Sequence, residues 1–482
     1  MSVNKALRFS VLDRYSGLVI NFIVSVILAR LLTPDELGVF SLTMVLLAIV
    51  QTMRDMGAGT YIIQEKELTT DRIRAAWTVQ LGIGFSIAVL VLALAHPAAI
   101  FYDDMRIRGV LVLLALNFAI NPIGAITVSL LLRNMEFKKI AIVRFCGAVT
   151  GGTVSIGLAV EGYGPASLAL GSVATTIISA FLLSCFRPAG LPWRPGLKEV
   201  RRVLSVGTKL TGAALVTSVA KAAPEASLGR FQGMVSTGLY ARATGLISLF
   251  DRLVMDALNN IMLPTFSSLK REGRDPTATF LNAFEILTAI GYSFFLGLAF
   301  LADYVILILY GAQWLPAAST AKILCLNAAL ALPLALTGPL LIAGGRIRKT
   351  LTLSTTAALL TISAAAIGAT FDLETLAMLI SAATAISAAL WLRAAQEDLS
   401  APFSELVRSG TKSLIIAAIT CGPLLLLPPF TAAGIAEAPY QIALTIASSL
   451  LAFVVALRVL CPHILSQILR FFGMRTADGN HP

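Results

Sequence analysis

The sequence is poor in charged residues, and its few cysteines and histidines follow no disulfide or metal pattern. Only 13% of its 482 residues are charged, whereas a soluble domain usually carries about 25%. The five cysteines lie in or beside apolar stretches without paired spacing, which excludes a disulfide framework and a CxxC metal site. There is no HExxH, P-loop or GxGxxG motif, so the sequence indicates neither a metal nor a cofactor.

The chain instead contains many long apolar stretches. Apolar residues make up 57% of the chain, and the mean hydropathy is +0.84. A membrane span needs about 20 mostly apolar residues. Because lipid offers backbone groups no hydrogen-bond partner, such stretches should be helices. We count fourteen, at roughly 15–32, 37–53, 76–95, 109–132, 140–160, 164–186, 203–223, 235–263, 280–301, 324–343, 351–371, 373–391, 413–430 and 440–460.

The basic residues lie mostly on one side of these predicted spans. With the N-terminus inside, 29 of the 37 lysines and arginines fall in inside segments, six fall in outside loops, and Arg242 and Arg252 lie within a span. This distribution follows the positive-inside rule and predicts that both termini are cytoplasmic. It also accounts for the net charge of +11 without a nucleic-acid partner. The start of the chain has no small-residue cleavage site, so the first span should be retained.

The two halves of the chain show the same order of features. Each contains a span with proline, a basic inside loop, a further span and an acidic outside turn, and the offset is about 210 residues. Repeated halves are a common plan in transporters. The corresponding residues are Asn117, Pro122, Arg133 and Glu161 in the first half and Asn327, Pro333, Arg346 and Asp372 in the second.

We therefore expect an all-α polytopic membrane protein of about 14 transmembrane helices, with two six-helix lobes around a central cavity and a C-terminal helix pair. Glycines in the fifth span, such as Gly147 and Gly151, should allow neighbouring helices to approach closely. The expected segments are an N-terminal lobe (1–186), a cytoplasmic inter-lobe loop (187–202), a C-terminal lobe (203–395), a terminal helix pair (396–461) and a cytoplasmic tail (462–482).

Polar residues inside the spans are the candidates for function, because charge in a membrane is costly and usually faces a cavity or a partner. In the first span, Arg14 and Asn21 share one stripe with small and hydroxyl residues at spacings of three and four. Arg14 lies near the cytoplasmic end, so an alternative is that it only extends to the interface. Lys221 of the seventh span should lie deeper, toward the outer side.

The eighth span is the richest in polar residues. Arg242, Gly245, Arg252, Asp256 and Asn259 share a face about 100° wide. Arg252 and Asp256 are four residues apart and can pair along the helix. Arg242 has no acidic partner in its own span, which makes it a candidate for binding an anionic substrate through its planar guanidinium. The alternative for Arg242 is an ion pair with Asp55 or Glu225 from another span.

These candidate groups are more often cationic than anionic. A cationic cavity favours an anionic headgroup and disfavours lipophilic cations. No group of residues resembles a nucleophile, a general base or a metal site, so we do not expect an enzyme.

Several segments resemble one family. The stretch ARLLTPDELGVF (29–40) followed by RDMGAGTYIIQ (54–64) is similar to the start of bacterial polysaccharide flippases. These are the Wzx-like members of the polysaccharide transporter family, within the multidrug/oligosaccharidyl-lipid/polysaccharide exporter superfamily. Further segments fit the same family in the same order: LGRFQGMVSTGLYARATGL (228–246), LPTFSSL (263–269), GAQWLPAASTAKIL (311–324) and AGGRIRK (343–349).

The resemblance implies two helical lobes around an aqueous cavity in the bacterial inner membrane. It implies flipping of an oligosaccharide repeat unit, linked through pyrophosphate to undecaprenol, for exopolysaccharide or O-antigen (lipopolysaccharide) biosynthesis. Polysaccharide polymerase and export machinery are candidate partners besides membrane lipid. Family members carry cations in the cavity, and Arg242 and Arg252 match them here; Arg14 and Lys221 are candidates to assist Arg242 in holding the pyrophosphate.

Two alternatives stay open at this point. One is a cation-coupled small-molecule or drug exporter of the same superfamily, for which Asp256 is the best candidate for a coupling carboxylate. The other is a membrane assembly partner of a polysaccharide polymerase that transports nothing.

Overall fold

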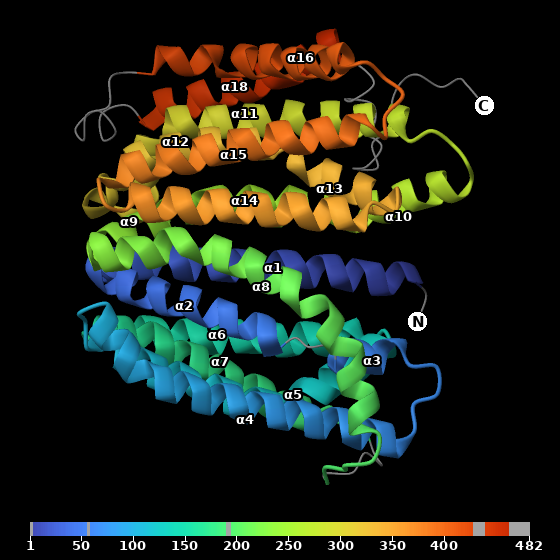
Figure 1. Cartoon of the computed structure of the whole chain (residues 1–482). Coiled ribbons are helices and arrows are strands. Elements are labelled where there is room, and N and C mark those ends of the chain that lie inside the picture. The colour runs from blue at the N-terminus through green and yellow to red at the C-terminus, as the bar shows by residue number, and fades with distance from the viewer. Residues whose placement is uncertain (1–2, 55–57, 189–193, 428–438, 462–482) are drawn as a thin grey trace. The chain divides into compact units, whose positions relative to one another are not determined.

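The computed structural model describes residues 3–54, 58–188, 194–427 and 439–461, and these residues are almost wholly helical (Figure 1). The helices before residue 250 are α1 (Val3–Leu31), α2 (Pro34–Arg54), α3 (Ala58–Gln64), α4 (Thr70–Phe101), α5 (Arg106–Arg133), α6 (Phe137–Val160), α7 (Pro165–Cys185), α8 (Val200–Phe231) and α9 (Met234–Phe250).

A π-helical turn, η1 (Asp251–Met255), follows α9 directly. The later helices are α10 (Asp256–Arg271), α11 (Thr277–Tyr310), η2 (Ala312–Trp314), α12 (Ala317–Ala331), α13 (Leu334–Ala343), α14 (Ile347–Gly368), α15 (Leu373–Gln396), α16 (Phe403–Cys421), η3 (Gly422–Leu426) and α18 (Pro439–Leu460). No strand occurs in the described ranges, so the predicted all-α fold is confirmed.

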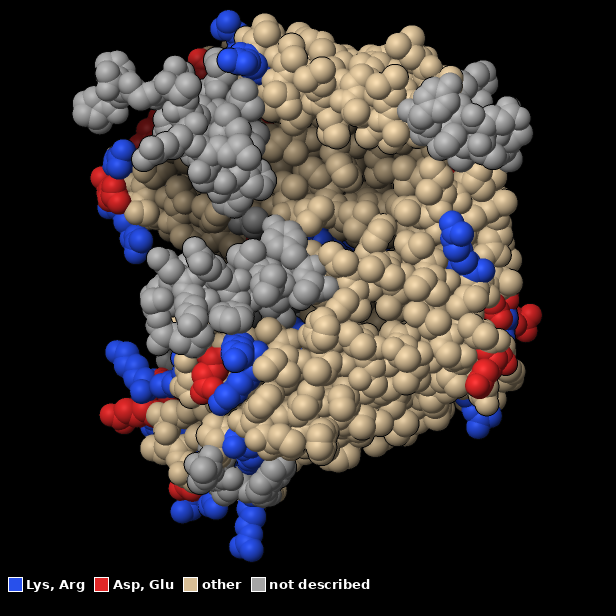
Figure 2. Space-filling model, turned by 180° about the vertical axis from the view of Figure 1, so that it is seen from behind, with Lys and Arg blue, Asp and Glu red and all other residues tan. Residues whose placement is uncertain are grey.

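Eleven helical segments among the described residues are long and apolar enough to cross a membrane. This number is compatible with the fourteen predicted spans, each of which falls wholly or mostly on a helix. The three predicted spans outside the eleven are α1, α8 and the continuous α9–η1–α10, and these carry the candidate polar residues. On the face shown in Figure 2, charged side chains gather toward the ends of the helices and leave a broad uncharged surface between them. The chain is a multi-pass membrane protein.

The helices pack as two compact units, residues 1–241 and 242–482, so the division falls within α9. In the first unit α4 packs on α5, α7 on α5 and α6, α1 on α6, and α2 on α8. In the second, α11 packs on α12 and α16, α15 on α12 and α14, and α18 on α16. The lobe boundaries expected from the sequence, with a loop at 187–202, stay a prediction.

The predicted inter-lobe loop is attached to α4 over its described part. Thr78 Oγ1 accepts a hydrogen bond from the amide of Gly196 (2.9 Å) and lies 2.8 Å from its carbonyl oxygen. A Cβ on Gly196 would come within 2.9 Å of the Arg74 side chain. This part of the loop therefore packs on the first unit.

The prolines of the two corresponding spans, Pro122 and Pro333, affect their helices differently. The helix is interrupted between α12 and α13, at Leu332 and Pro333, although both residues keep right-handed helical backbone angles. By contrast, α5 continues through Pro122, although proline removes a backbone hydrogen bond. Trp77 Nε1 donates to the Pro122 carbonyl at 3.1 Å, and Gly84 of α4 leaves room for α5 at this level. Packing of α4 thus supports a continuous helix through this proline.

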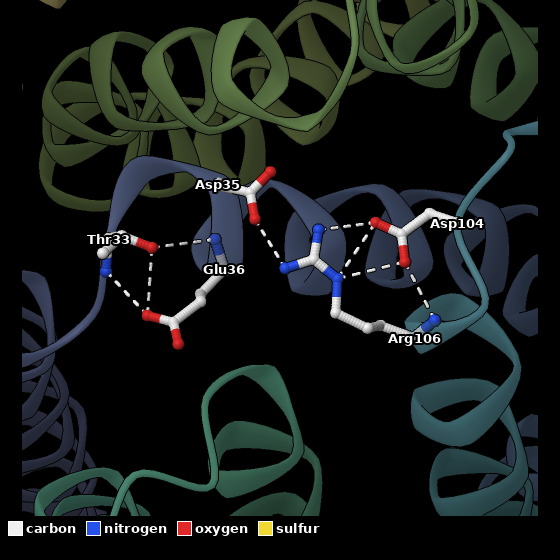
Figure 3. A network of polar contacts seen from close by, with 5 residues as sticks. All are labelled: Thr33, Asp35, Glu36, Asp104 and Arg106. Atoms are coloured by element: carbon white, nitrogen blue, oxygen red, sulfur yellow. Dashed lines mark hydrogen bonds and ion pairs between the residues drawn. The ribbon is translucent and has the colours of Figure 1, made fainter.

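The start of α2 is held by two sets of polar contacts (Figure 3). Thr33 and Glu36 form a capping box, in which the Glu36 amide donates to Thr33 Oγ1 (3.3 Å) and the Thr33 amide donates to Glu36 Oε2 (2.9 Å). The guanidinium of Arg106, at the start of α5, bridges Asp35 at 2.5 Å and Asp104 at 2.6 Å. These contacts tie the first turn of α2 to the α4–α5 turn.

Glycines bring helices of the first unit to backbone contact. A Cβ on Gly38 of α2 would overlap the carbonyl oxygen of Met234, and a Cβ on Gly238 of α9 would overlap that of Pro34. Gly151 of α6 likewise lies against Gly171 of α7, as its sequence predicts. In lipid, such close packing replaces the hydrophobic driving force between helices.

We expect Gly38→Ala to destabilise the protein by about 1–3 kcal/mol, the usual effect of overpacking. The methyl group has no space because the α9 backbone occupies its position. The measurement is the apparent Tm in detergent. Gly82→Ala in α4, whose Cβ would meet nothing within 4 Å, is the control and should leave the Tm unchanged. Equal Tm values for both variants would contradict the close contact.

We expect Asp104→Asn to lower stability by about 0.5–1 kcal/mol at neutral pH. Burial raises the pKa of the Asp104 carboxyl, but the hydrogen bonds and charge of Arg106 outweigh it and hold the pKa below its usual range. A lowered folded-state pKa stabilises above the ordinary pKa of aspartate, and this contribution is lost as the pH falls through the lowered value. The Tm difference from the wild type should therefore vanish in acid. Asp103→Asn, which changes the exposed neighbouring carboxyl, is the control, and a pH-independent difference would contradict the ion pair.

Candidate functional site

The six candidate residues belong to three helical segments, divided equally between the units. Arg14 and Asn21 lie on α1 and Lys221 on α8, within the first unit. Arg242, Arg252 and Asp256 lie on α9–η1–α10, within the second. The predicted site residues thus come as two sets, and we describe each in its own unit.

The continuous α9–η1–α10 segment contains a π-helical turn at the position of Arg252. Such turns are rare in proteins overall, but many of those that occur lie at functional sites. Gly245, Arg252 and Asp256 are exposed, whereas Arg242, at the edge of the predicted polar face, is buried. Of these four residues expected on one face, three are therefore exposed and only Arg242 is buried. The side chain of Asn259 lies outside the described residues.

Arg242 is buried against two aromatic rings of its own unit. Its guanidinium carbon lies 4.8 Å from the centroid of the Tyr310 ring and 5.2 Å from that of Trp314. Gly311 follows α11 with φ +100°, a backbone conformation that favours glycine, and the chain then turns into η2, where Trp314 is fully buried. Arg242 itself is 8% exposed. A desolvated cation over aromatic faces gains about 2 kcal/mol, so this contact has a structural role as well.

The candidates of the first unit are more open. Asn21 of α1 is exposed, and a Cβ on Gly17, one turn earlier, would meet nothing within 4 Å. Lys221 is also exposed. The side chain of Arg14 lies outside the described residues. An exposed amide and an exposed ammonium in predicted spans can offer hydrogen bonds to a polar ligand.

Basic residues of the segment AGGRIRK have acidic partners in the second unit. Arg346 pairs with Glu397 at 2.6 Å and with Asp398 at 3.4 Å, and Lys349 pairs with Glu397 at 2.5 Å. The hydrogen bonds from Lys349 and Arg346 lower the pKa of Glu397. These cations join the α13–α14 turn to the end of α15, so they serve the fold in addition to orienting the chain.

Glu225 of α8 is a polar residue whose role the sequence did not reveal. The sequence indicates Glu225 only as an alternative ion-pair partner of Arg242. In the structure, Ser41 Oγ of α2 donates to Glu225 Oε2 at 2.5 Å, and Tyr240 of α9 lies close enough for electrostatic interaction. Pro224 directly before an acidic residue, just beyond the predicted span 203–223, was the only available signal.

The described residues offer no metal centre. They contain no group of three or more His, Cys, Asp or Glu side chains placed to hold an ion, and all five cysteines in this part of the chain are free.

Comparison with known proteins gives the family. The family model described as "Polysaccharide biosynthesis protein" matches residues 27–319. An uncharacterized membrane protein in the cps region of Klebsiella pneumoniae is 24% identical over 68% of each chain. The succinoglycan biosynthesis transport protein ExoT of Rhizobium meliloti is 22% identical over 65% of this chain and 63% of its own length.

A solved structure shares the fold. It is the lipid II flippase MurJ in an inward closed conformation, with a TM-score of 0.76 and 14% identity over 97% of this chain and 99% of that one. At this identity the likeness establishes the fold alone. The family match, which spans more than half of the chain, and the segments at 29–40 and 228–246 agree with it. The chain belongs to the polysaccharide biosynthesis protein family.

Proposed function

We propose that this protein flips a lipid-linked oligosaccharide across the bacterial inner membrane. The substrate is a repeat unit joined through pyrophosphate to undecaprenol, which would be made at the cytoplasmic face and delivered to the periplasmic face for polymerisation. Both termini would lie in the cytoplasm, as the excess of basic residues on one side supports.

The observation that carries this proposal is the match of residues 27–319 to a polysaccharide biosynthesis family in a multi-pass membrane fold. A relative is named for succinoglycan biosynthesis transport. A protein of the same fold is named a lipid II flippase. A transporter in this setting has a polysaccharide precursor as its natural cargo.

The exposed polar side chains suit the polar part of such a cargo. Arg252 presents a planar guanidinium at a π-helical turn and can bind a phosphate with two parallel hydrogen bonds. Lys221 adds a positive charge, while Asn21 and Asp256 offer hydrogen bonds to sugar hydroxyls.

Arg242 would contribute to pyrophosphate binding in a different way, because it starts from a buried position. Its guanidinium would have to leave the rings of Tyr310 and Trp314 to meet the substrate. Binding would then compete with a contact inside the protein, which favours release of the cargo after transport. Arg14 is proposed as a helper from its position on α1 alone.

The first test of this function is deletion of the gene, with analysis of lipid-linked oligosaccharide on each face of the membrane. We expect repeat units to accumulate on the cytoplasmic side and the polymer to be lost, because the precursor cannot cross unaided. The gene supplied on a plasmid should restore both. Normal polymer and normal sidedness in the deletion strain would contradict the proposal and favour a small-molecule exporter.

A second test replaces Arg252. Arg252→Ala should lower polymer export by about tenfold or more, since a hydrogen bond to a charged group contributes about 1.5–3 kcal/mol. Arg252→Lys, which keeps the charge but loses the planar fork, should lie in between. Export is measured at equal amounts of folded protein in the membrane.

The matched control is Arg348→Ala, which removes an exposed positive charge in the first turn of α14, outside the predicted spans. It should leave export unchanged. Full export by Arg252→Ala would show that this guanidinium has no part in transport.

A further inference from the structure

Three polar side chains meet between α2, α8 and α9 in the first unit. Ser41 Oγ donates to Glu225 Oε2 at 2.5 Å. Tyr240, which is 6% exposed, interacts electrostatically with the same carboxylate. Glu225 itself is partly buried.

The glycine contact described above holds this group in position. Gly38 lies three residues before Ser41 on α2, and Gly238 lies two residues before Tyr240 on α9. Because the two backbones touch there, both hydroxyl groups are brought to one level beside α8. Pro224 precedes Glu225 and removes one backbone hydrogen bond of α8 at this point. The carboxylate thus lies on a weakened helix, opposite two closely packed ones.

Among the residues that the structure describes, no lysine or arginine forms an ion pair with Glu225. On α8, Lys221 is exposed one turn earlier, and Arg230 lies 5.4 Å over the ring of Phe101. At the end of α4, the other titratable groups are His96, which is exposed, and Tyr102 beside Gly229. At the start of α2 they are Asp35 and Glu36, bonded to Arg106 and Thr33, and Tyr240 lies on α9.

Another buried carboxylate of the chain shows the contrast. Glu285 of α11, in the second unit, lies 3.7 Å from Lys412 Nζ of α16 and accepts a hydrogen bond from the Cys461 thiol at 3.0 Å. A cation compensates its charge. An enclosed carboxylate without a cation is costly when ionised and is stabilised by taking up a proton. The hydrogen bond that Ser41 donates favours the ionised carboxylate, so burial without a cation is the feature that favours a neutral Glu225.

We propose that Glu225 is a proton-binding site, where the neutral acid is held between Ser41 and Tyr240 while α8 packs on α2. Binding forms one O–H bond on a carboxylate oxygen, and the proton comes from water and returns to it. When α8 separates from α2, water reaches the carboxylate and the proton leaves. The Ser41–Glu225 distance leaves no space for a metal cation between the two oxygens.

Coupling of this proton to transport rests on the proposed flippase function. The proton would favour the arrangement in which α8 and α2 are packed, and its release would favour their separation. Two-state coupling of this kind typically changes an equilibrium by about 5–150-fold. Glu225 would then provide a link between the proton gradient and movement of the cargo.

The direct test is infrared spectroscopy of the purified full-length protein in lipid nanodiscs, which needs no substrate. At pH 7 the wild type should show a band of a protonated carboxylic acid that Glu225→Gln removes. Glu161→Gln, the same change at an exposed carboxyl in the α6–α7 turn, should retain the band. If Glu225→Gln does not fold, Glu225→Asp serves instead and should shift the band. A spectrum that neither change at Glu225 alters would overturn the proposal.

The coupling is tested by polymer export in the deletion strain. At equal amounts of folded protein, Glu225→Gln should lower export about tenfold, and the residual export should no longer respond to a protonophore. Export equal to the wild type, with the same protonophore response, would overturn the coupling. Failure of the wild-type gene itself to restore polymer would instead refute the flippase function, and the infrared result would still decide whether Glu225 binds a proton.

Discussion

The requirement that backbone groups in lipid be hydrogen-bonded within the chain underlies the whole structure. It explains why the described residues are helical and why polar contacts gather at helix ends, as at Thr33 and Glu36. It also leaves close packing as the main force between helices. Gly38 and Gly238 meet this need by allowing α2 and α9 to touch through their backbones. The position of the Ser41–Glu225–Tyr240 group follows from that contact.

The segments that identify the family are largely elements of this packing. The stretch 29–40 contains the capping box and Gly38, and the stretch 228–246 contains Gly238 and the division between the units. The stretch 311–324 begins at the glycine that brings Trp314 beneath Arg242. Such motifs specify a fold, because they mark places where only one residue type fits. They carry no information about which sugar is transported.

Charged residues in or beside the predicted spans have three kinds of environment. Arg242 lies over aromatic rings, and the charge of Glu285 is compensated by Lys412. Glu225 lies beside the hydroxyl groups of Ser41 and Tyr240, without a cation. The first two arrangements stabilise the charged form of the side chain. In the third, burial without a cation favours the neutral form, although the hydrogen bond donated by Ser41 favours the ionised one, so Glu225 is a group that can change its state. The exposed residues Arg252 and Asp256 form a separate class, which we propose for contact with the cargo.

The sequence by itself determined the class of protein, the positions of the helices and the family, because apolar length, charge asymmetry and packing motifs are local properties of the chain. It also identified α1, α8 and α9–α10 as the polar segments. Only the tertiary structure decided which polar residues are open and which are enclosed. A helical wheel places Arg242 with Arg252, but the rings that bury Arg242 come from residues about 70 positions later. Glu225 likewise acquires its character from Ser41, 184 residues away, a contact that no periodicity encodes.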